Sequence, residues 1–411
     1  MNHAPDPAAE SSPTTRGGWR LLALLIAISA VGPLSVNVIV PALPGLATAF
    51  AADPAIVQLT VSLYFAGLAC AQLVMGPLSD RFGRRPVLLG GFVVAVVTSF
   101  AAAAATTVNL LVTARTAQAL GASTGIVIGR AIIRDLYQRD RAASMLGWVT
   151  MSVVAVPMFG PLIGGLLETY FGWRAIFLFV GAASLLTLAW AALALPETRH
   201  PQPPEARASR RLWAESRDLI RSPTFAGYVL ACAMISGPFY TTTGGAPHVV
   251  ITLMGRSATE FGLWLIFISV GYMAGNFLAG WLSVRHGGGA MIWWGLALEL
   301  VATLASALPV TFMDDPGPAS IFVPLFVVYV ANGMALPNAI AGAISVKPDA
   351  AGTAAGVTGC VQMGWGAIIS QLIAYPVAGP WGAAALTWAM VAQGVAGLLA
   401  FWLLVRPPRP A

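Results

Sequence analysis

The chain has 411 residues, of which 57% are hydrophobic and only 9% are charged. A soluble globular domain carries about a quarter charged residues, so this composition excludes a soluble protein. The formal net charge of +6 does not indicate a nucleic-acid partner, because the basic residues gather on one side of the predicted membrane segments. The three cysteines lie inside apolar runs and are interpreted as small buried residues, so no metal site is expected.

The first segment is polar. Residues 1–18 are rich in proline, alanine and serine, which predicts a disordered cytoplasmic N-terminus. An apolar run follows and reaches Val40. A membrane-spanning helix needs about 20 apolar residues, and this run has no small-residue cleavage site, so we predict a retained first helix. Eleven further apolar runs follow, and the sequence therefore predicts an all-α membrane protein with 12 transmembrane helices.

A charged decapeptide, Gly76-Pro-Leu-Ser-Asp-Arg-Phe-Gly-Arg-Arg85, separates the second and third apolar runs. We interpret it as a tight turn between two membrane helices. Asp80 can pair with Arg81 or Arg84, and a carboxylate can also accept hydrogen bonds from the free N–H groups at a helix N-terminus. The segment is a candidate conformational latch, and the alternative is a charge cluster that only sets orientation. The latch residues are Gly76, Asp80, Arg81, Gly83, Arg84 and Arg85.

The basic residues predict the orientation of the chain. If the N-terminus is cytoplasmic, 19 basic residues lie in cytoplasmic segments and only Arg174 and Arg256 lie outside. Cytoplasmic loops of membrane proteins carry an excess of lysine and arginine. Both termini are therefore predicted to be cytoplasmic, and the one remaining basic residue, Arg115, lies within the membrane.

Two six-helix bundles are predicted, at residues 19–195 and 224–405, with a cytoplasmic linker at 196–223 and a cytoplasmic tail at 406–411. Within the linker, Arg210–Arg217 is interpreted as a short amphipathic helix. The segment Gly280–Gly287 repeats Gly76–Gly83 at five of eight positions, 204 residues later. A Gly-Pro pair also recurs 205 residues apart, at Gly32 and Gly237. Two matches at nearly the same spacing predict a duplicated six-helix unit with the solute site between its halves.

Further motifs follow the charged turn in order. They are Arg115–Gly121, Arg130–Tyr137, Gly160–Gly165, Leu336–Asn338, and Gly352–Gly356 followed by Gln362. Together with the turn, over about residues 20–405, they resemble the major facilitator superfamily, and within it the Bcr/CflA-type drug:proton antiporters. The resemblance implies two six-helix halves that export drugs by alternating access. It also implies that Asp80 meets the start of helix 11 near Gly352 and Thr353, and that this contact closes the cytoplasmic side.

The same resemblance gives the fifth helix an antiporter motif. Small residues permit close helix packing and proline removes a backbone hydrogen bond, which predicts a kink and a tight contact with the opposite half. We interpret the motif as an outer-side hinge or seal, with packing alone as the alternative. Its residues are Gly160, Pro161, Gly164 and Gly165.

One position departs from the subgroup. Its members usually carry an acid in helix 1, whereas this chain has Asn37 in the segment Ser35-Val-Asn-Val. An amide cannot take up and release a proton near neutral pH, so the usual proton site is missing. Three hypotheses stay open: proton-coupled export, a proton-uncoupled facilitator or metabolite transporter, and a non-transporting receptor or scaffold on the same fold.

Three charged or titratable residues lie within or close to apolar runs. Arg115 is interpreted as a cavity residue, with a structural arginine bonded to carbonyl groups as the alternative. Glu299 and His248 are candidate proton carriers, and their alternatives are an acid held between helices or facing lipid and an interfacial histidine. The chain has no nucleophile–base pair and no P-loop, so we expect neither an enzyme nor direct ATP-driven transport, and no cofactor.

The predicted cavity lining combines aromatic, thioether and amide groups with almost no fixed charge. Its members are Asn37, Tyr64, Arg115, Gln118, Met158, Phe239, Tyr240, Asn276, Asn338 and Gln362. Such a lining suits a small lipophilic, mostly neutral solute. The sequence and the resemblance together predict a monomeric multi-pass transporter in a bacterial inner membrane, with the lipid bilayer, a small solute and protons as its partners.

Overall fold

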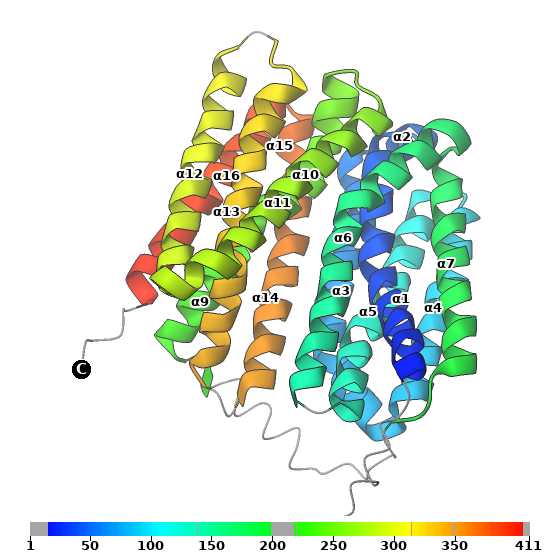
Figure 1. Ribbon diagram of the computed structural model, residues 1–411. Coiled ribbons are helices and arrows are strands. Elements are labelled where there is room, and N and C mark those ends of the chain that lie inside the picture. The colour runs from blue at the N-terminus through cyan, green and yellow to red at the C-terminus, as the bar shows by residue number, and fades with distance from the viewer. Residues whose placement is uncertain are drawn as a thin grey trace, which may run out of the picture.

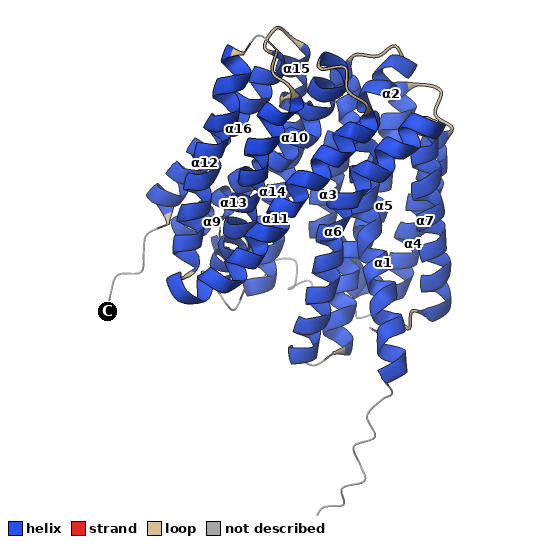
Figure 2. Ribbon diagram, turned by 45° about the horizontal axis from the view of Figure 1, so that its top comes forward, coloured by secondary structure: helices blue, strands red, loops and turns tan. Residues whose placement is uncertain are grey.

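The computed structural model describes residues 15–137, 139–198, 218–219, 221–313, 315–347 and 350–405. Every element with assigned bounds in these ranges is helical (Figure 2). The predicted amphipathic helix at Arg210–Arg217, the tail at 406–411 and residues 1–14 lie outside the described residues. The first helix begins at Thr15, four residues before the predicted start of the first bundle at residue 19.

The first half of the chain contains eight helical segments. They are α1 (Thr15–Ile39), η1 (Val40–Ala42), α2 (Leu43–Ala49), α3 (Pro54–Phe82), α4 (Arg84–Ala103), α5 (Val108–Leu136), α6 (Arg139–Phe171) and α7 (Trp173–Ala194). The run α1–η1–α2 is almost continuous because Pro41 and Pro44 each stand near the start of a new helical segment, where a missing N–H is tolerated.

The second half repeats this order. Its segments are α9 (Pro223–Ile235), α10 (Gly237–Pro247), the π-helical η2 (His248–Leu253), α11 (Ala258–His286), α12 (Gly288–Phe312), α13 (Pro318–Ser345), α14 (Ala351–Leu372), α15 (Ala374–Ala378) and α16 (Gly382–Leu404). Among the described residues, ten helical stretches are long and apolar enough to cross a membrane. Two further long helical segments are not among these ten: the 33-residue α6 and the broken run from α9 to η2.

The two copies of the repeated segment form the same turn. Helices α3 and α11 are each 29 residues long and each begin with a side-chain cap, from Asp53 and Ser257 respectively. They end at Gly83 (φ +97°) and Gly287 (φ +80°), in the left-handed region that a glycine adopts without steric cost. The repeated sequence therefore specifies one local structure twice.

Helix pairing also recurs between the halves. In the first half α4 packs against α5 and α7, and α3 against α5; in the second half α12 packs against α13 and α16, and α11 against α13. Across the halves, α3 lies against α14 and α6 against α11 (Figure 1). The turn at Gly83, which joins α3 to α4, is flanked by Arg81, Arg84 and Arg85. We call the end of the bundle where it lies the basic end, and the other the opposite end.

Candidate functional site

A cavity of about 340 Å³ lies between the two halves. The first half contributes Asn37, Val40, Arg130, Pro157, Met158 and Pro161. The second half contributes Ser236, Phe239, Tyr240, Thr242, Thr243, Leu265, Ile268, Ser269, Tyr272, Met273, Tyr329, Asn332, Leu336, Gln362 and Met363. The lining residues are mostly apolar or aromatic, with hydroxyl and amide groups among them. We call this space the central cavity.

Five of the ten predicted cavity residues line the central cavity: Asn37, Met158, Phe239, Tyr240 and Gln362. The amide Nδ2 of Asn37 donates to the carbonyl of Pro33 over 2.8 Å, so the amide is fixed along α1. The Tyr240 ring stands edge-on to that of Phe65, with centroids 4.9 Å apart. This aromatic pair joins α10 to α3 and thus holds the two halves together beside the cavity.

Several lining residues were not predicted from the sequence. Arg130 was named only as the first residue of the motif Arg130–Tyr137; it lies on α5 and lines the cavity. Asn332 is 4% exposed and lies near the middle of α13. Its amide in the apolar run Val327–Ala335 was a signal that could have been used, because a polar side chain at that depth needs a partner or a wet cavity.

Arg115 lies inside the first half and does not line the central cavity. Its side chain is fully buried at 0% exposure. The guanidinium Nη1 donates to the Ser35 hydroxyl over 2.6 Å and to the carbonyl oxygen of the Gln118 side chain. Its Nε donates to the backbone carbonyl of Thr60 over 3.3 Å. One cation therefore joins α1, α3 and α5.

Aromatic rings and a second amide complete this network. The Arg115 guanidinium carbon lies 4.3 Å from the centre of the Tyr64 ring, a cation–π contact. The Tyr64 hydroxyl donates to the carbonyl of Gly32 over 3.1 Å, and the Gln118 amide donates to the Ser99 hydroxyl over 2.5 Å. The three predicted cavity residues Tyr64, Arg115 and Gln118 are thus brought together, but behind the cavity wall.

Asn276 and Asn338 also lie outside the lining. Each amide donates to a carbonyl four residues earlier in its own helix, that of Tyr272 over 2.9 Å and that of Met334 over 2.9 Å. The Asn338 side chain faces Gly288 at the start of α12. Both amide groups therefore find hydrogen-bond acceptors within their own helices, α11 and α13, and do not need a solute.

At the basic end, Arg84 joins the charges of the predicted latch. Its Nη1 lies 2.7 Å from the Asp80 carboxylate and its Nε lies 3.0 Å from that of Asp135 on α5. The Nη1 also donates to the Ser79 hydroxyl over 2.6 Å. The Arg84 side chain is only 5% exposed, so the pair with Asp80 is partly protected from solvent. Arg81 instead stacks over the ring of Phe82 at 5.0 Å.

Glu197, which sequence reasoning did not identify, completes the turn. Its carboxylate accepts the backbone N–H groups of Arg84 over 3.0 Å and Arg85 over 3.1 Å. These are free N–H groups at the start of α4, where a carboxylate is favourable. The Arg85 guanidinium donates to the carbonyl of Ala192 over 2.7 Å. The turn is therefore tied to the end of α7.

We expect Asp80→Asn to shift the protein toward the conformation open at the basic end, because the family resemblance places Asp80 against the start of helix 11 near Gly352 and Thr353, and a neutral amide would bind that helix N-terminus less strongly than a carboxylate. A single cysteine at Met158, in a background without Cys70, Cys232 and Cys360, reports this opening through its rate of maleimide labelling from the basic side. Asp53→Asn, the same change at the other end of α3, is the control. Equal labelling rates in the two variants would contradict a gating role for Asp80.

The antiporter motif on α6 faces two different partners. A Cβ on Gly160 would lie 3.0 Å from the Cβ of Asn37, and one on Gly164 would overlap the carbonyl oxygen of Val38. A Cβ on Gly165 would instead lie 2.5 Å from the carbonyl oxygen of Ala258, at the start of α11 in the other half. Pro161 lines the central cavity. The motif thus brings α1 and α11 into backbone contact with one helix.

The two candidate proton carriers lie apart from the central cavity and from each other. Glu299 on α12 is 0% exposed, and neither of its carboxylate oxygens has a hydrogen-bond partner. His248 begins η2 and lines a separate cavity at the opposite end. An ionised carboxylate without a partner is costly to bury, so Glu299 needs a bound proton or a conformation that supplies a partner.

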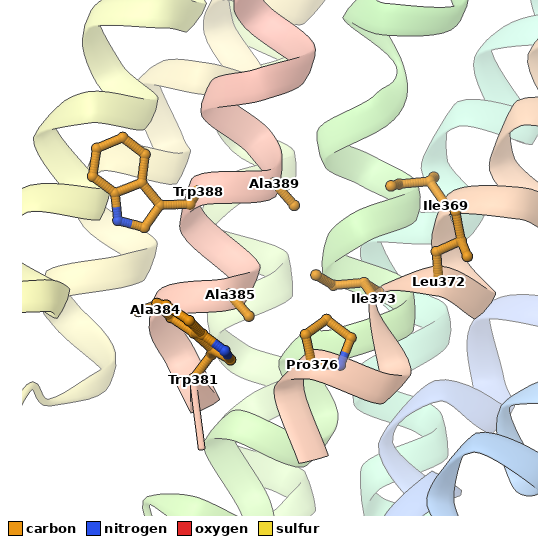
Figure 3. Close-up of a pocket in the computed structure, with 9 residues that line it drawn as sticks. All are labelled: Ile369, Leu372, Ile373, Pro376, Trp381, Ala384, Ala385, Trp388 and Ala389. Atoms are coloured by element: carbon orange, nitrogen blue, oxygen red, sulfur yellow. The ribbon is translucent and has the colours of Figure 1, made fainter. Parts of the chain in front are cut away.

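A further pocket of about 400 Å³ lies on the second half alone, between α14, α15 and α16 (Figure 3). Its walls are almost wholly apolar, and Ala385 and Ala389 on α16 point across it toward Ile373. Trp381 is 70% exposed. A membrane protein exposes such apolar surface to lipid tails, so this pocket is part of the lipid-facing wall.

Comparisons with known proteins agree with this architecture. A family model described as Major Facilitator Superfamily matches residues 24–370. The chain is 28% identical to "Bicyclomycin resistance protein homolog" of Haemophilus influenzae (84% of this chain, 87% of that protein). It is 29% identical to "Multidrug resistance protein D" of Escherichia coli strain K12 (87% of this chain, 90% of that protein).

A solved structure shows the same fold. The crystal structure of a D-xylose-proton symporter superposes with a TM-score of 0.75 at 16% identity, over 94% of this chain and 97% of that one. The family model covers most of the chain, including both halves. The chain belongs to the Major Facilitator Superfamily of membrane transporters, as its motifs predicted.

Proposed function

We propose that this protein exports a small lipophilic, mostly neutral compound by alternating access of the central cavity to the two sides of the membrane. The observation that carries the proposal is a cavity of about 340 Å³ between the halves, lined mainly by apolar, aromatic, hydroxyl and amide groups. Relatives named for bicyclomycin and multidrug resistance support an exported drug as the solute.

The charge of the lining favours neutral solutes. Arg130 is a cation in the lining, and no Asp or Glu stands among the lining residues that the structure describes. A cationic solute would gain no ion pair there and would meet repulsion from Arg130. Arg130 therefore makes the site less suited to cationic solutes than a site that carries an acid.

We further propose 12 membrane spans, with α6 and the α9–η2 run added to the ten apolar helices, and both termini in the cytoplasm. The excess of basic residues at the basic end supports this orientation. A multi-pass location in a bacterial inner membrane follows from the same argument, and the monomer is the proposed functional unit because the cavity is complete within one chain.

A growth assay tests the export function. The full chain is expressed in a bacterial host that lacks its own drug pumps, and growth is measured with bicyclomycin and with matched neutral and cationic antibiotics. Raised tolerance to bicyclomycin or other neutral compounds is the expected result. Tolerance confined to cationic drugs would contradict the proposed charge preference, and no change for any compound would favour the scaffold hypothesis.

The energy source separates two versions of this function. Proton-coupled antiport is the first, supported by family resemblance, and a proton-uncoupled facilitator is the second, favoured by Asn37 at the cavity in place of an acid. Among the Asp and Glu side chains that the structure describes, that of Glu299 is the one that is fully buried, so Glu299 is the candidate proton carrier for coupling. Because it does not line the cavity, it would act through a conformation that gives it access to water.

We expect Glu299→Gln to abolish substrate-induced proton release while solute binding persists, because the amide matches the acid in shape but cannot exchange a proton. The release is measured with a pH-sensitive dye on purified protein in detergent, at several values between about pH 6 and pH 8, near neutral pH where a coupling group must exchange its proton. Glu260→Gln, near the surface at the start of α11, is the control. Absence of release from the unmodified protein would favour the facilitator.

A further inference from the structure

A second cavity, of about 320 Å³, lies between the halves at the opposite end. Its walls come from α2, the start of α3, the α10–η2 run and α15, and it shares no lining residue with the central cavity. Representative lining residues are Leu43, Thr48, Gln58, Gly244, His248 and Val377. We call it the outer pocket.

The outer pocket lies next to the central cavity along the same helices, with packed side chains between them. On the α1–α2 run, Val40 lines the central cavity and Leu43 lines the outer pocket. On α10, Thr243 lines the central cavity and the next residue, Gly244, lines the outer pocket. Three residues of helix advance by about 4.5 Å, so roughly one helical turn of packed side chains separates the two spaces. A solute leaving toward the opposite end would therefore meet the outer pocket next.

Gln58 is the feature that points to a ligand. Its side chain is 3% exposed and lines the outer pocket, yet its amide Nε2 has no hydrogen-bond partner. A buried donor without an acceptor costs about 1–3 kcal/mol, so such groups are normally satisfied. The missing acceptor is one that a bound molecule in the pocket can supply.

Neighbouring polar groups on α3 are satisfied, which makes Gln58 an exception. One turn later, the Ser62 hydroxyl donates to the side-chain carbonyl of Gln371 over 2.7 Å. One turn earlier, the backbone carbonyl of Ala55 accepts from the Gln371 amide over 2.8 Å. Gln371 belongs to α14, so these bonds tie the halves together around Gln58, whose own amide donor is left without a partner.

We propose that the outer pocket is a second binding site, for a neutral, largely apolar compound whose hydrogen-bond acceptor receives the Gln58 Nε2–H. The described lining residues include no Asp, Glu, Lys or Arg, and His248 is the residue among them that can titrate near neutral pH, so a neutral imidazole leaves the site without charge. The pocket volume accommodates a two-ring aromatic compound. Only the role of the site on an exit path rests on the proposed export function; binding itself does not.

Photo-labelling with benzophenone tests the site on the full chain in lipid nanodiscs. Benzophenone is apolar, carries one ketone acceptor, and on irradiation bonds to C–H groups that it contacts. Labelled residues are identified by mass spectrometry and are normalised to labelling of the lipid-facing Leu193, which is 90% exposed. We expect labelling of Leu43, Thr48 or Val377 in the unmodified protein.

Two matched variants separate the cavities. Gln58→Leu removes the donor with little change in volume and should lower outer-pocket labelling about two- to tenfold, the effect of one lost hydrogen bond. Gln362→Leu, the same change in the central cavity, should leave outer-pocket labelling unchanged. Competition in the unmodified protein gives a second readout: fluorenone, which has the acceptor, should displace benzophenone better than fluorene, which lacks it.

Three results would overturn the proposal: no outer-pocket labelling above the Leu193 reference, equal labelling in Gln58→Leu and the unmodified protein, or equal competition by fluorene and fluorenone. The growth assay for export is independent of these readouts. Failure of that assay with labelling as expected would overturn the export function and support the site. Export with no specific labelling would do the reverse.

Discussion

Replacing Gly165 with valine is expected to abolish most export while leaving the fold intact. A Cβ at this position would lie 2.5 Å from the carbonyl oxygen of Ala258, in the backbone of the other half. Overpacking of this kind costs about 1–3 kcal/mol, which shifts a conformational equilibrium by about 5–150-fold. The halves could no longer close at the opposite end, and alternating access would stop with that side open.

The neighbouring glycine supplies a matched control. A side chain on Gly164 would overlap the carbonyl of Val38 within its own half, so Gly164→Val should lower the melting temperature of the purified protein. Gly90→Val should change neither export nor the melting temperature, because nothing lies within 4 Å of a Cβ at that position. A single cysteine at Met158 should be labelled from the opposite side faster in Gly165→Val. Full export by that variant would contradict a role for Gly165 in closure.

Removing Arg115 is expected to cause the largest loss of stability in the first half. Arg115→Leu leaves the Thr60 carbonyl and the side chains of Ser35 and Gln118 without their donor, and each unsatisfied buried group costs about 1–3 kcal/mol. Arg115→Lys should also destabilise, because an ammonium cannot reproduce the planar, multi-donor geometry of guanidinium. A sharply lower melting temperature in detergent is the expected measurement for both.

Arg174→Leu is the control for this experiment. Arg174 is exposed and its guanidinium carbon lies 4.2 Å from the centre of the Trp173 ring, so its loss should affect the melting temperature little. Because Arg115 lies behind the cavity wall, solute preference should stay the same in whatever fraction of Arg115→Lys folds. Normal stability with altered solute preference would show instead that Arg115 reaches the solute in another conformation.

Local features of the fold follow directly from the sequence. The charged decapeptide predicted a tight turn, and the structure makes that turn at Gly83 (φ +97°), with residues 76–82 forming the end of α3 and Arg84 and Arg85 beginning α4. Its degenerate copy forms the corresponding turn at Gly287. Such features depend on hydrophobic length, on turn residues and on short-range charge, all of which lie within a few residues of one another. The motifs predicted the superfamily for the same reason.

The site was less predictable, because a helix rotates by about 100° per residue and only packing decides which face meets the cavity. Asn37, Tyr240 and Gln362 face it as expected, whereas Asn276 and Asn338 bond to their own helices. Acidic partners also come from distant segments: Glu197 binds the start of α4 although more than a hundred residues separate them.

The sequence alone determined that the chain is an all-helical membrane protein of a transporter superfamily, because composition, apolar run length and ordered motifs do not depend on how helices are rotated. Only the tertiary structure decided that Arg115 is buried within the first half and bonds to α1 and α3 there, and that Arg130 lines the cavity. It also decided that Gly164 and Gly165 face different halves. These outcomes depend on backbone contacts between helices remote in sequence. Those contacts form only when the two halves pack together.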